Sequence, residues 1–474
     1  MADLLDLSSE IIDEQRLDVP VNRVTNELSE VANGLAVVES FSHSVVVDTG
    51  EGLVAFDSSG GATGAAVVEA IRGWNPTPVR HLVYTHGHAD HVGGSGHFAA
   101  AFGRPEVTGH RRVLDRLDRY ALTSDWNRLI NARQFGGTRG DLGFGLDNGA
   151  ARGSDFNTFL PAETLRPDRI VDDYETLTIG DTVIELRHAR GETDDHLWAW
   201  LPDRRAIMSG DFLIWNFPNA GNPQKVQRYP DEWAVALREM IAMGPELLLP
   251  AHGLPIAGSE RIARVLDEVA TALERLVESV LAMMNSGASL DEVIHTEHLP
   301  EGTLARPYLR PLYDEPEFVV RNIWRLYGGW WDGAASRLKP APDRQLAEVV
   351  AELAGGVDAL IARAHIAVDQ GDLRLACHLV DFAAWSAGDD PDVHRERAAV
   401  YRLRRSAESS LMAKGLYAAA ARESEALLPV RDRRRKAPGA TSRSDTRARP
   451  IPAICVRATR SRSINIASAT VAAG

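Results

Sequence analysis

Residues 85–94 read THGHADHVGG and place three histidines and one aspartate within six positions. Imidazole nitrogens and carboxylate oxygens suit zinc, and two histidines separated by one residue on a loop can point to the same side of the backbone. His86 and His88 therefore suit one ion, and Asp90 and His91 would face a second ion close by. An isolated HxH pair is more often a solvated polar loop, but HxHxDH directly after an apolar strand indicates a metal site.

Short strands and helices must position this loop. In residues 1–256 the segments GLAVVES, SVVVDTG and GLVAFDS are β-branched runs separated by glycine, as expected for consecutive antiparallel strands. A helical segment follows, and the apolar run VRHLVY leads directly into the loop. Strand-like segments return later, as in HLWAWLP and LLLPAHG. Clusters of strands separated by helices predict an α/β (α+β) fold with a sheet-on-sheet core and helices outside it.

Residues 257–429 form a second zone that is nearly all helical. Between residues 259 and 287 the apolar residues recur at spacings of three and four, and Ser289 and Glu292 form a capping box for the next helix. Later segments are typical of antiparallel helical hairpins. Their apolar faces more often form a core than an interface, although a helical region beside a catalytic one could also dimerise.

Composition and charge exclude several classes of protein. No stretch approaches the roughly 20 uncharged apolar residues of a membrane span. The first 30 residues are acidic where a secretion signal would be basic and then apolar, so we expect a cytoplasmic protein. The formal charge of −14 argues against a nucleic-acid partner.

The last zone, residues 430–474, is basic and rich in serine, alanine and proline. A disordered extension is the expected interpretation, and a nucleic-acid-binding arm is the alternative. Cys377 and Cys455 lie far apart and form no CxxC pair, so histidines and carboxylates must hold any metal.

The stretch THGHADHVGG resembles the HxHxDH signature of the metallo-β-lactamase superfamily. The resemblance implies an αββα sandwich with two divalent metal ions, expected to be zinc, at one edge of the sheets. It also implies further ligands downstream, and ARGETDDHLWAW, MSGDFLIW and LLLPAHGLP supply Glu192, Asp211 and His252 in the right order. The implied ligand set is His86, His88, Asp90, His91, Glu192, Asp211 and His252.

Glu192 is a departure from this pattern, because most of the superfamily has histidine there. The change leaves three anionic ligands for two dications, which makes the metals less electrophilic but still able to lower the pKa of a water. His188 and His196 are the alternative ligands. His196, at the start of a strand-like segment, could instead support a ligand from behind.

The glutamate narrows the resemblance to the alkyl sulfatases of this superfamily, which carry a glutamate at this place and a proline, like Pro202 here, ten residues beyond. The segment YLRPLYDEPEFVVRNIWRLYGGWWDG is similar to part of their helical dimerisation domain, and NARQFGGTRGDLGFGLDNG to their active-site loop. The resemblance covers about residues 25–425. It implies a homodimer that hydrolyses a small anionic ester.

Two departures concern the substrate. Asp211 stands where these sulfatases have glutamate, although either carboxylate can bridge two metals. Gln224 falls where an arginine would hold the sulfate, which leaves Lys225 and Arg228 as candidate replacements beside Asn216 and Asn219. Both cations could equally be ordinary surface residues. Four aromatic residues could line an alkyl path or belong to the core: Trp215, Phe217, Phe135 and Phe144.

The leading hypothesis is therefore metal-assisted hydrolysis of an alkyl sulfate to an alcohol and inorganic sulfate, with Asp90 and Asp211 as the catalytic residues that orient the attacking water. A second hypothesis is hydrolysis of another substrate, such as a lactone, thioester, phosphate ester or β-lactam. A third is a metal-binding but catalytically idle dimeric scaffold. The sequence does not separate carbon–oxygen from sulfur–oxygen cleavage.

Overall fold

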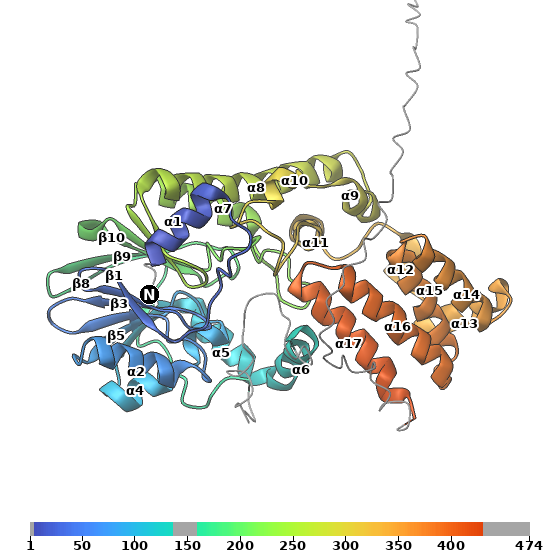
Figure 1. The fold of residues 1–474 in the computed structure, drawn as a ribbon, viewed down its shortest axis with the longest axis horizontal. Coiled ribbons are helices and arrows are strands. Elements are labelled where there is room, and N and C mark those ends of the chain that lie inside the picture. Colours follow the sequence, from blue (N-terminus) through green and yellow to red (C-terminus); the bar gives the residue numbers. More distant parts are fainter. Residues whose placement is uncertain (1–3, 136–158, 430–474) are drawn as a thin grey trace, which may run out of the picture. The chain divides into compact units, whose positions relative to one another are not determined.

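Two β-sheets pack face to face, with helices on both outer faces (Figure 1). This arrangement is seen in a computed structural model, which describes residues 4–135 and 159–429. The αββα sandwich and the all-helical region behind it are thereby confirmed.

The first sheet contains seven strands in chain order. Its first four strands pair antiparallel, and β4 to β7 pair in parallel. Parallel neighbours need long crossovers, which place helices against the outer face of the sheet. The strands are β1 (Leu28–Ala32), β2 (Leu35–Val38), β3 (Ser44–Asp48), β4 (Leu53–Phe56), β5 (Val79–Val83), β6 (Glu106–His110) and β7 (Arg169–Val171).

The second sheet contains six strands in the order β13-β12-β11-β10-β9-β8. All of its neighbours are antiparallel except β11 and β12, which helix α7 (Pro230–Ala242) connects. The strands are β8 (Tyr174–Ile179), β9 (Thr182–His188), β10 (Leu197–Leu201), β11 (Ala206–Gly210), β12 (Leu247–Pro250) and β13 (Ile256–Ala257).

Alternation along the strands explains how the first sheet fills two cores. Val45 and Val47 lie in the cluster between the sheets, whereas Val46 lies in the cluster beneath the outer helices. Successive side chains of a strand point to opposite faces, so a continuous valine run buries both faces. The helices on this side are α2 (Gly64–Trp74), α4 (Ser95–Phe102) and α5 (Arg111–Leu122).

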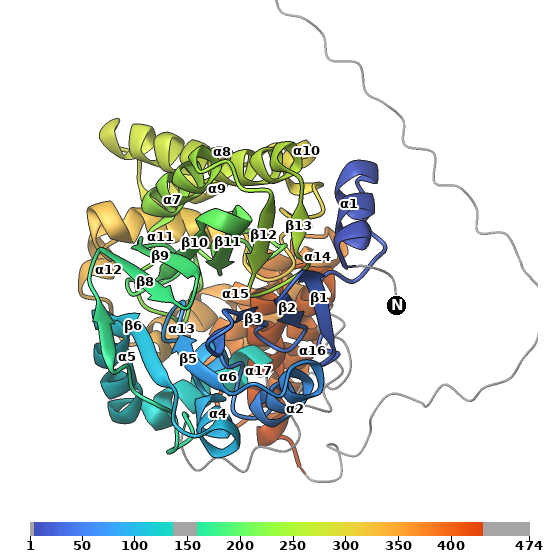
Figure 2. The same ribbon diagram turned by 90° about the vertical axis from the view of Figure 1, so that its left-hand side faces the viewer.

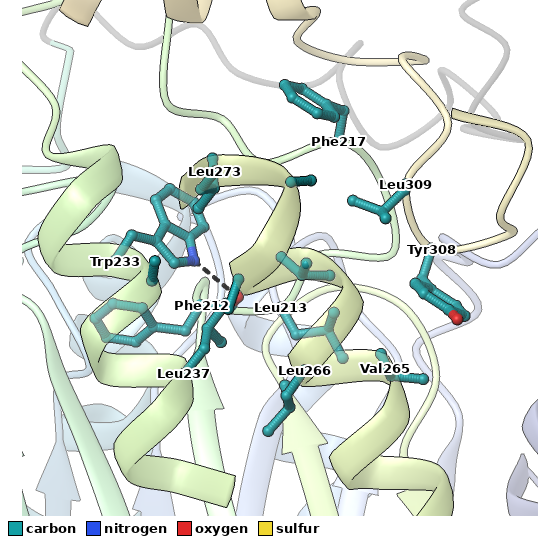
Figure 3. Close-up of a cluster of buried hydrophobic side chains, with 14 of the residues drawn as sticks. Phe212, Leu213, Phe217, Trp233, Leu237, Val265, Leu266, Leu273, Tyr308 and Leu309 are labelled. Atoms are coloured by element: carbon teal, nitrogen blue, oxygen red, sulfur yellow. Dashed lines mark hydrogen bonds between the residues drawn. The ribbon is translucent and has the colours of Figure 1, made fainter. Parts of the chain in front are cut away.

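Helices α7 and α8 (Ser259–Asn285) cover the outer face of the second sheet, as Figure 2 shows. The indole of Trp233 on α7 donates a 3.0 Å hydrogen bond to the carbonyl of Phe212 (Figure 3). The same buried cluster includes Leu266 of α8 and, later in the chain, Tyr308. One continuous cluster therefore crosses the predicted boundary between residues 256 and 257, and the division into domains stays a prediction.

Antiparallel hairpins build the rest of the helical region. Helix α14 packs on α15, and α16 on α17, while α17 also packs against α6 of the N-terminal part. The capping box between Ser289 and Glu292 is confirmed at the start of α9. The helices are α9 (Leu290–Thr296), α10 (Glu301–Leu304), α11 (Pro316–Gly328), α12 (Ala335–Leu338), α13 (Asp343–Ala354), α14 (Val357–Asp369), α15 (Leu373–Ser386), α16 (Pro391–Ala407) and α17 (Leu411–Leu427).

Among the described residues, none of the helices combines the length and apolar character that crossing a membrane requires.

The first described element is the helix α1 (Leu4–Glu14), which lies against β13. The predictions for Phe144, for most of the segment resembling an active-site loop and for the tail 430–474 fall outside the described residues.

Candidate metal centre

The loop 85–94 leaves the end of β5 and enters the short helix α3 (Ala89–Val92). Asp57, directly after the neighbouring strand β4, holds the start of this loop. Its carboxylate accepts hydrogen bonds from the Thr85 backbone N–H at 2.8 Å and from the Thr85 hydroxyl at 2.7 Å. Adjacent parallel strands thus bring a buried acid against the first residue of the motif.

A first group of possible ligand atoms comprises His86, His88 and Asp211, all within 4.8 Å of one another. His86 Nε2 lies 2.9 Å from His88 Nδ1 and 3.8 Å from Asp211 Oδ2. Asp211 follows β11 in the second sheet, so this group forms where the two sheets meet. A second group comprises Asp90, His91 and His252, again within 4.8 Å.

Asp211 lies between the two groups. While its Oδ2 faces His86, its Oδ1 lies 3.4 Å from His91 Nε2 and 3.6 Å from His252 Nε2. Asp90 Oδ2 lies 3.4 Å from His252 Nε2. One carboxylate is therefore within reach of both groups, as a ligand shared by two ions would be.

The donor set fits divalent metal ions. His91 Nε2 and Asp211 Oδ1 are buried and have no hydrogen-bond partner among residues 4–135 and 159–429. Asp57 lies 2.8 Å from His91 Nδ1, which leaves Nε2 of that ring facing the centre. A carboxylate behind a histidine is the usual way to fix a ligating imidazole. Imidazole and carboxylate donors suit zinc, manganese or iron.

Electrostatics favour the neutral imidazole of the first group, which is the form that binds metal. Burial lowers the pKa of His86 and His88 well below the ordinary histidine value, and neighbouring positive charges lower it further. Burial also lowers the pKa of His91, but Asp211, Asp57 and Asp90 outweigh it and leave that pKa raised. Three carboxylates thus surround His91, and two divalent cations would neutralise their negative charge.

Glu192 lies beside the first group but outside it. Its Oε1 is 3.4 Å from His88 Nδ1, and the same oxygen is 2.7 Å from Arg228 Nη1 and accepts a hydrogen bond from Asn219. Burial raises the pKa of Glu192 to about 8, against the opposing effect of Arg228. Its role as a ligand stays a prediction.

The two alternative histidines are engaged elsewhere. His188 Nε2 lies 3.1 Å from the Asp194 carbonyl, and its ring stacks on His110. His196 Nε2 accepts a 3.1 Å hydrogen bond from the Asp211 backbone N–H, and its ring stacks on Phe212. His196 therefore supports Asp211 from behind.

A buried ion pair supports the motif from the other side. Asp195, fully buried two residues before β10, pairs with Arg116 of α5 at 2.7 Å and accepts a hydrogen bond from the Gly87 N–H at 3.1 Å. A Cβ on Gly87 would lie 2.9 Å from both partners, so only glycine fits between the two histidines. Neither partner was identified from the sequence, where both resemble ordinary surface charges.

A cavity opens onto the two groups, and all four predicted substrate-binding residues line it: Asn216, Asn219, Lys225 and Arg228. Arg228 is only 2% exposed, which rules out a surface cation. Lys225 Nζ donates to Asn131 of α6 (Ser124–Phe135) at 3.0 Å. Among the described residues Asn216 Oδ1, Asn219 Oδ1 and Arg228 Nε are buried without a hydrogen-bond partner. These atoms are available to a polar ligand.

The remaining predictions divide between cavity and core. Gln224 donates through Nε2 to the Ile130 carbonyl and is thus bonded to α6. Trp215 and Phe217 belong to the buried cluster of Figure 3, so the core alternative is correct for them, whereas Phe135 lines the cavity. The sequence offered no signal for two further lining residues, Tyr313 and Leu411, because both lie in the helical region.

Two family models match the chain. Residues 37–252 match the model of the metallo-beta-lactamase superfamily, and residues 289–426 match the model of alkyl sulfatase dimerisation. Residues 37–252 therefore carry the sequence pattern of the metallo-β-lactamase superfamily, and the helical region that follows carries that of alkyl sulfatase dimerisation. Six of the seven ligand residues that the sequence resemblance implies lie in two adjacent groups.

Curated alkylsulfatases are similar to the chain. It is 27% identical over 370 residues to a linear primary-alkylsulfatase of Pseudomonas sp. (strain ATCC 19151), covering 75% of this chain and 67% of the relative. It is 23% identical over 334 residues to the alkyl/aryl-sulfatase BDS1 of Saccharomyces cerevisiae, covering 68% of this chain and 50% of the relative. The chain thus spans between half and two thirds of these relatives.

A solved alkylsulfatase structure shares the fold. The stereoselective inverting sec-alkylsulfatase Pisa1 from Pseudomonas sp. superposes with a TM-score of 0.72 at 21% identity, over 85% of this chain and 66% of that chain. The superposition extends well beyond the sandwich and into the helical region. The sequence resemblance to this branch of the superfamily is confirmed.

Proposed function

We propose that this protein is a metal-dependent hydrolase that cleaves alkyl sulfate esters to an alcohol and inorganic sulfate. The observation that carries the proposal is the cavity in which two groups of metal ligands face buried cationic and amide groups. Its remaining lining is largely apolar and aromatic, as a short or medium alkyl chain requires. The alkylsulfatase relatives support the same reaction.

Two divalent ions, which we propose to be zinc, would be held by His86, His88 and Asp211 and by Asp90, His91 and His252, with Glu192 completing the first group. When bound, they would supply Lewis acidity that lowers the pKa of a water toward neutrality. The carboxylates of Asp211 and Asp90 would accept hydrogen bonds from that water and so orient it. His196 accepts the hydrogen bond of the Asp211 backbone N–H and holds this residue in place.

The sulfate group would be held by Arg228, Lys225 and the two asparagines. Burial lowers the pKa of Lys225 to about 8, so its ammonium group is charged in most molecules at neutral pH. Arg228 is already paired with Glu192, yet its Nε is free among the described residues. Charge-assisted hydrogen bonds from both cations to sulfate oxygens would replace the arginine that Gln224 does not supply.

Release of inorganic sulfate from dodecyl sulfate by the purified, metal-loaded protein is the decisive test. We expect release that falls at least a hundredfold in His86→Ala, because the first ligand group is broken. Metal content near two ions per chain should accompany activity. Turnover of a lactone or thioester, without sulfate release from linear or branched alkyl sulfates, would contradict the proposed substrate.

We also propose that the protein is a homodimer through its helical region. The match to the alkyl sulfatase dimerisation model supports this assembly. So does an exposed apolar stripe on α13, formed by Leu346, Val349 and Leu353 at spacings of three and four. Exposed aromatic residues, Trp330 and Trp331, precede α12 in the same region.

A further inference from the structure

The cavity has one wall that comes from the helical region. Tyr313, in the segment before α11, and Leu411, the first residue of α17, both line it. They lie about 200 to 300 residues after the HxHxDH motif, so the fold alone brings them there. Leu411 is 1% exposed and is thus a packed part of the wall.

Backbone contacts fix these two residues to each other. The Leu411 N–H donates to the Leu312 carbonyl at 2.8 Å, and the Ser410 hydroxyl donates to the Tyr313 carbonyl at 2.9 Å. Ser410 also caps α17 by accepting from the Ala413 N–H. These hydrogen bonds therefore hold the N-terminus of α17 against the segment around Tyr313.

These two segments also contact α6, whose residue Phe135 lines the cavity next to them. Gln134 of α6 donates to the Tyr313 hydroxyl at 3.1 Å, and the rings of Phe135 and Tyr313 stack with centroids 6.5 Å apart. The helices touch at Gly415, where a Cβ would lie 1.9 Å from the Gln134 carbonyl oxygen. Only glycine permits this approach, so the spacing of the two walls depends on that residue.

The lining of the cavity contains two kinds of side chain. It includes metal ligands with the cationic and amide groups, and it also includes the apolar and aromatic side chains of Leu411, Phe135, Tyr120 and Phe159. The Tyr120 and Phe159 rings meet edge to face at 4.9 Å. A ligand whose charged end meets the metal ligands and the cations would therefore find these side chains for its apolar end.

We propose that the helical region selects the substrate by its tail, with Leu411 as the specificity-determining residue that limits chain length and Gly415 as a positioning residue that sets the spacing of the walls. This inference deepens the proposed function and rests on it. Each methylene group buried against the wall should strengthen binding about fourfold. The gain should end at the length at which the tail meets Leu411.

The test compares the full-length, metal-loaded protein with Leu411→Ala and Leu411→Phe. Calorimetric titrations with 1-alkanesulfonates from ethane- to dodecanesulfonate, which are not hydrolysed, give affinity against chain length. We expect the plateau to shift to longer chains in Leu411→Ala and to shorter chains in Leu411→Phe, with ethanesulfonate unchanged. Leu427→Ala is the matched control, because Leu427 lies on the same helix and is 59% exposed.

Gly415→Ala tests the close contact between α17 and α6 without changing a residue that lines the cavity. We expect it to weaken dodecanesulfonate binding and leave ethanesulfonate binding intact. The proposal would be overturned if the affinity of both Leu411 variants stopped rising at the same chain length as in the wild type. This comparison requires that the variants keep the metal content and circular dichroism of the wild type. An equal loss of affinity for every chain length would also overturn the proposal.

A second series of probes separates this inference from the proposed reaction. The 1-alkanols carry the tail without the sulfonate group. If alkanols bind with the same dependence on residue 411 while sulfonates do not bind, the tail site stands and the sulfate ester is wrong. If neither series binds to the wild-type protein, the tail site is overturned.

Discussion

Removing one partner of the buried pair between Arg116 and Asp195 should cost far more than breaking an exposed pair. Asp195→Ala would remove the fully buried partner and leave the buried guanidinium with only the partly exposed Asp194, 2.7 Å away, as counter-charge. We expect the free energy of unfolding to fall by about 3 kcal/mol. The Gly87 N–H would also lose its acceptor, so metal affinity should fall. Urea denaturation and metal analysis measure the two effects.

The control for that variant is Asp172→Ala, which breaks the exposed pair with Arg111 at 2.6 Å. Surface pairs contribute about 0–1 kcal/mol, so this change should be small. Equal losses in the two variants would contradict a special role for the buried pair.

Glu315, at the start of α11, makes stability depend on pH. Burial and, next, the nearby Glu408 raise its pKa from 4.5 to about 8. Because the folded state favours the protonated acid, the stabilisation is complete below pH 4.5 and is lost as the pH rises toward 8. Glu315→Gln should therefore melt at a higher temperature than wild type at pH 8.5, and the difference should shrink toward pH 5.

Thermal melting of the two proteins across this range checks the sign. Glu260→Gln, in the first turn of α8, serves as the comparison. A difference between Glu315→Gln and wild type that grows toward low pH would show that the glutamate is stabilising when charged.

At the scale of elements, the end of β11 shows how a strand terminus aims a ligand. Gly210 has φ of +53°, and a Cβ there would lie 2.4 Å from His196 Nε2, the acceptor of the Asp211 N–H. Gly210→Ala should therefore reduce metal content and sulfate release as well as stability. The left-handed backbone alone costs alanine about 1–2 kcal/mol.

Gly50→Ala isolates that backbone cost, since Gly50 has φ of +78° and open space around its Cβ position. It should lose stability but keep its metal. If Gly210→Ala also keeps full metal content and activity, the contact between His196 and Asp211 does not position the ligand.

Elements also explain how far the sequence could predict the structure. Alternating valines and the strand leading into His86 indicate the sandwich because their periodicity reflects which face is buried. The ligand groups follow from residues at strand ends, and Asp211 and His252 occupy such positions. No sequence pattern marks Tyr313 or Leu411 as residues of the cavity. Both are ordinary residue types in or near helices, and only the tertiary packing brings them to the cavity. For the same reason no sequence pattern indicated that the Gln224 side chain bonds to α6.

At the scale of the whole molecule, the exposed stripe on α13 predicts how copies associate. Leu346→Glu combined with Leu353→Glu places two charges on that face, and we expect the dimer to dissociate at micromolar concentration. Sedimentation equilibrium measures this, with Leu122→Glu as the control, because Leu122 is 87% exposed on α5, in the N-terminal part of the chain. An unchanged mass in the double variant would place the interface elsewhere.

The cluster that joins Phe212, Trp233, Leu266 and Tyr308 has a consequence for how such a protein can evolve. A gene that ended after residue 256 would encode a sandwich whose outer face of tryptophan, leucine and phenylalanine met water, and such faces promote aggregation. Modular exchange of the helical region is therefore constrained. A replacement must bring a helix that covers the same face and a side chain that lines the cavity beside it.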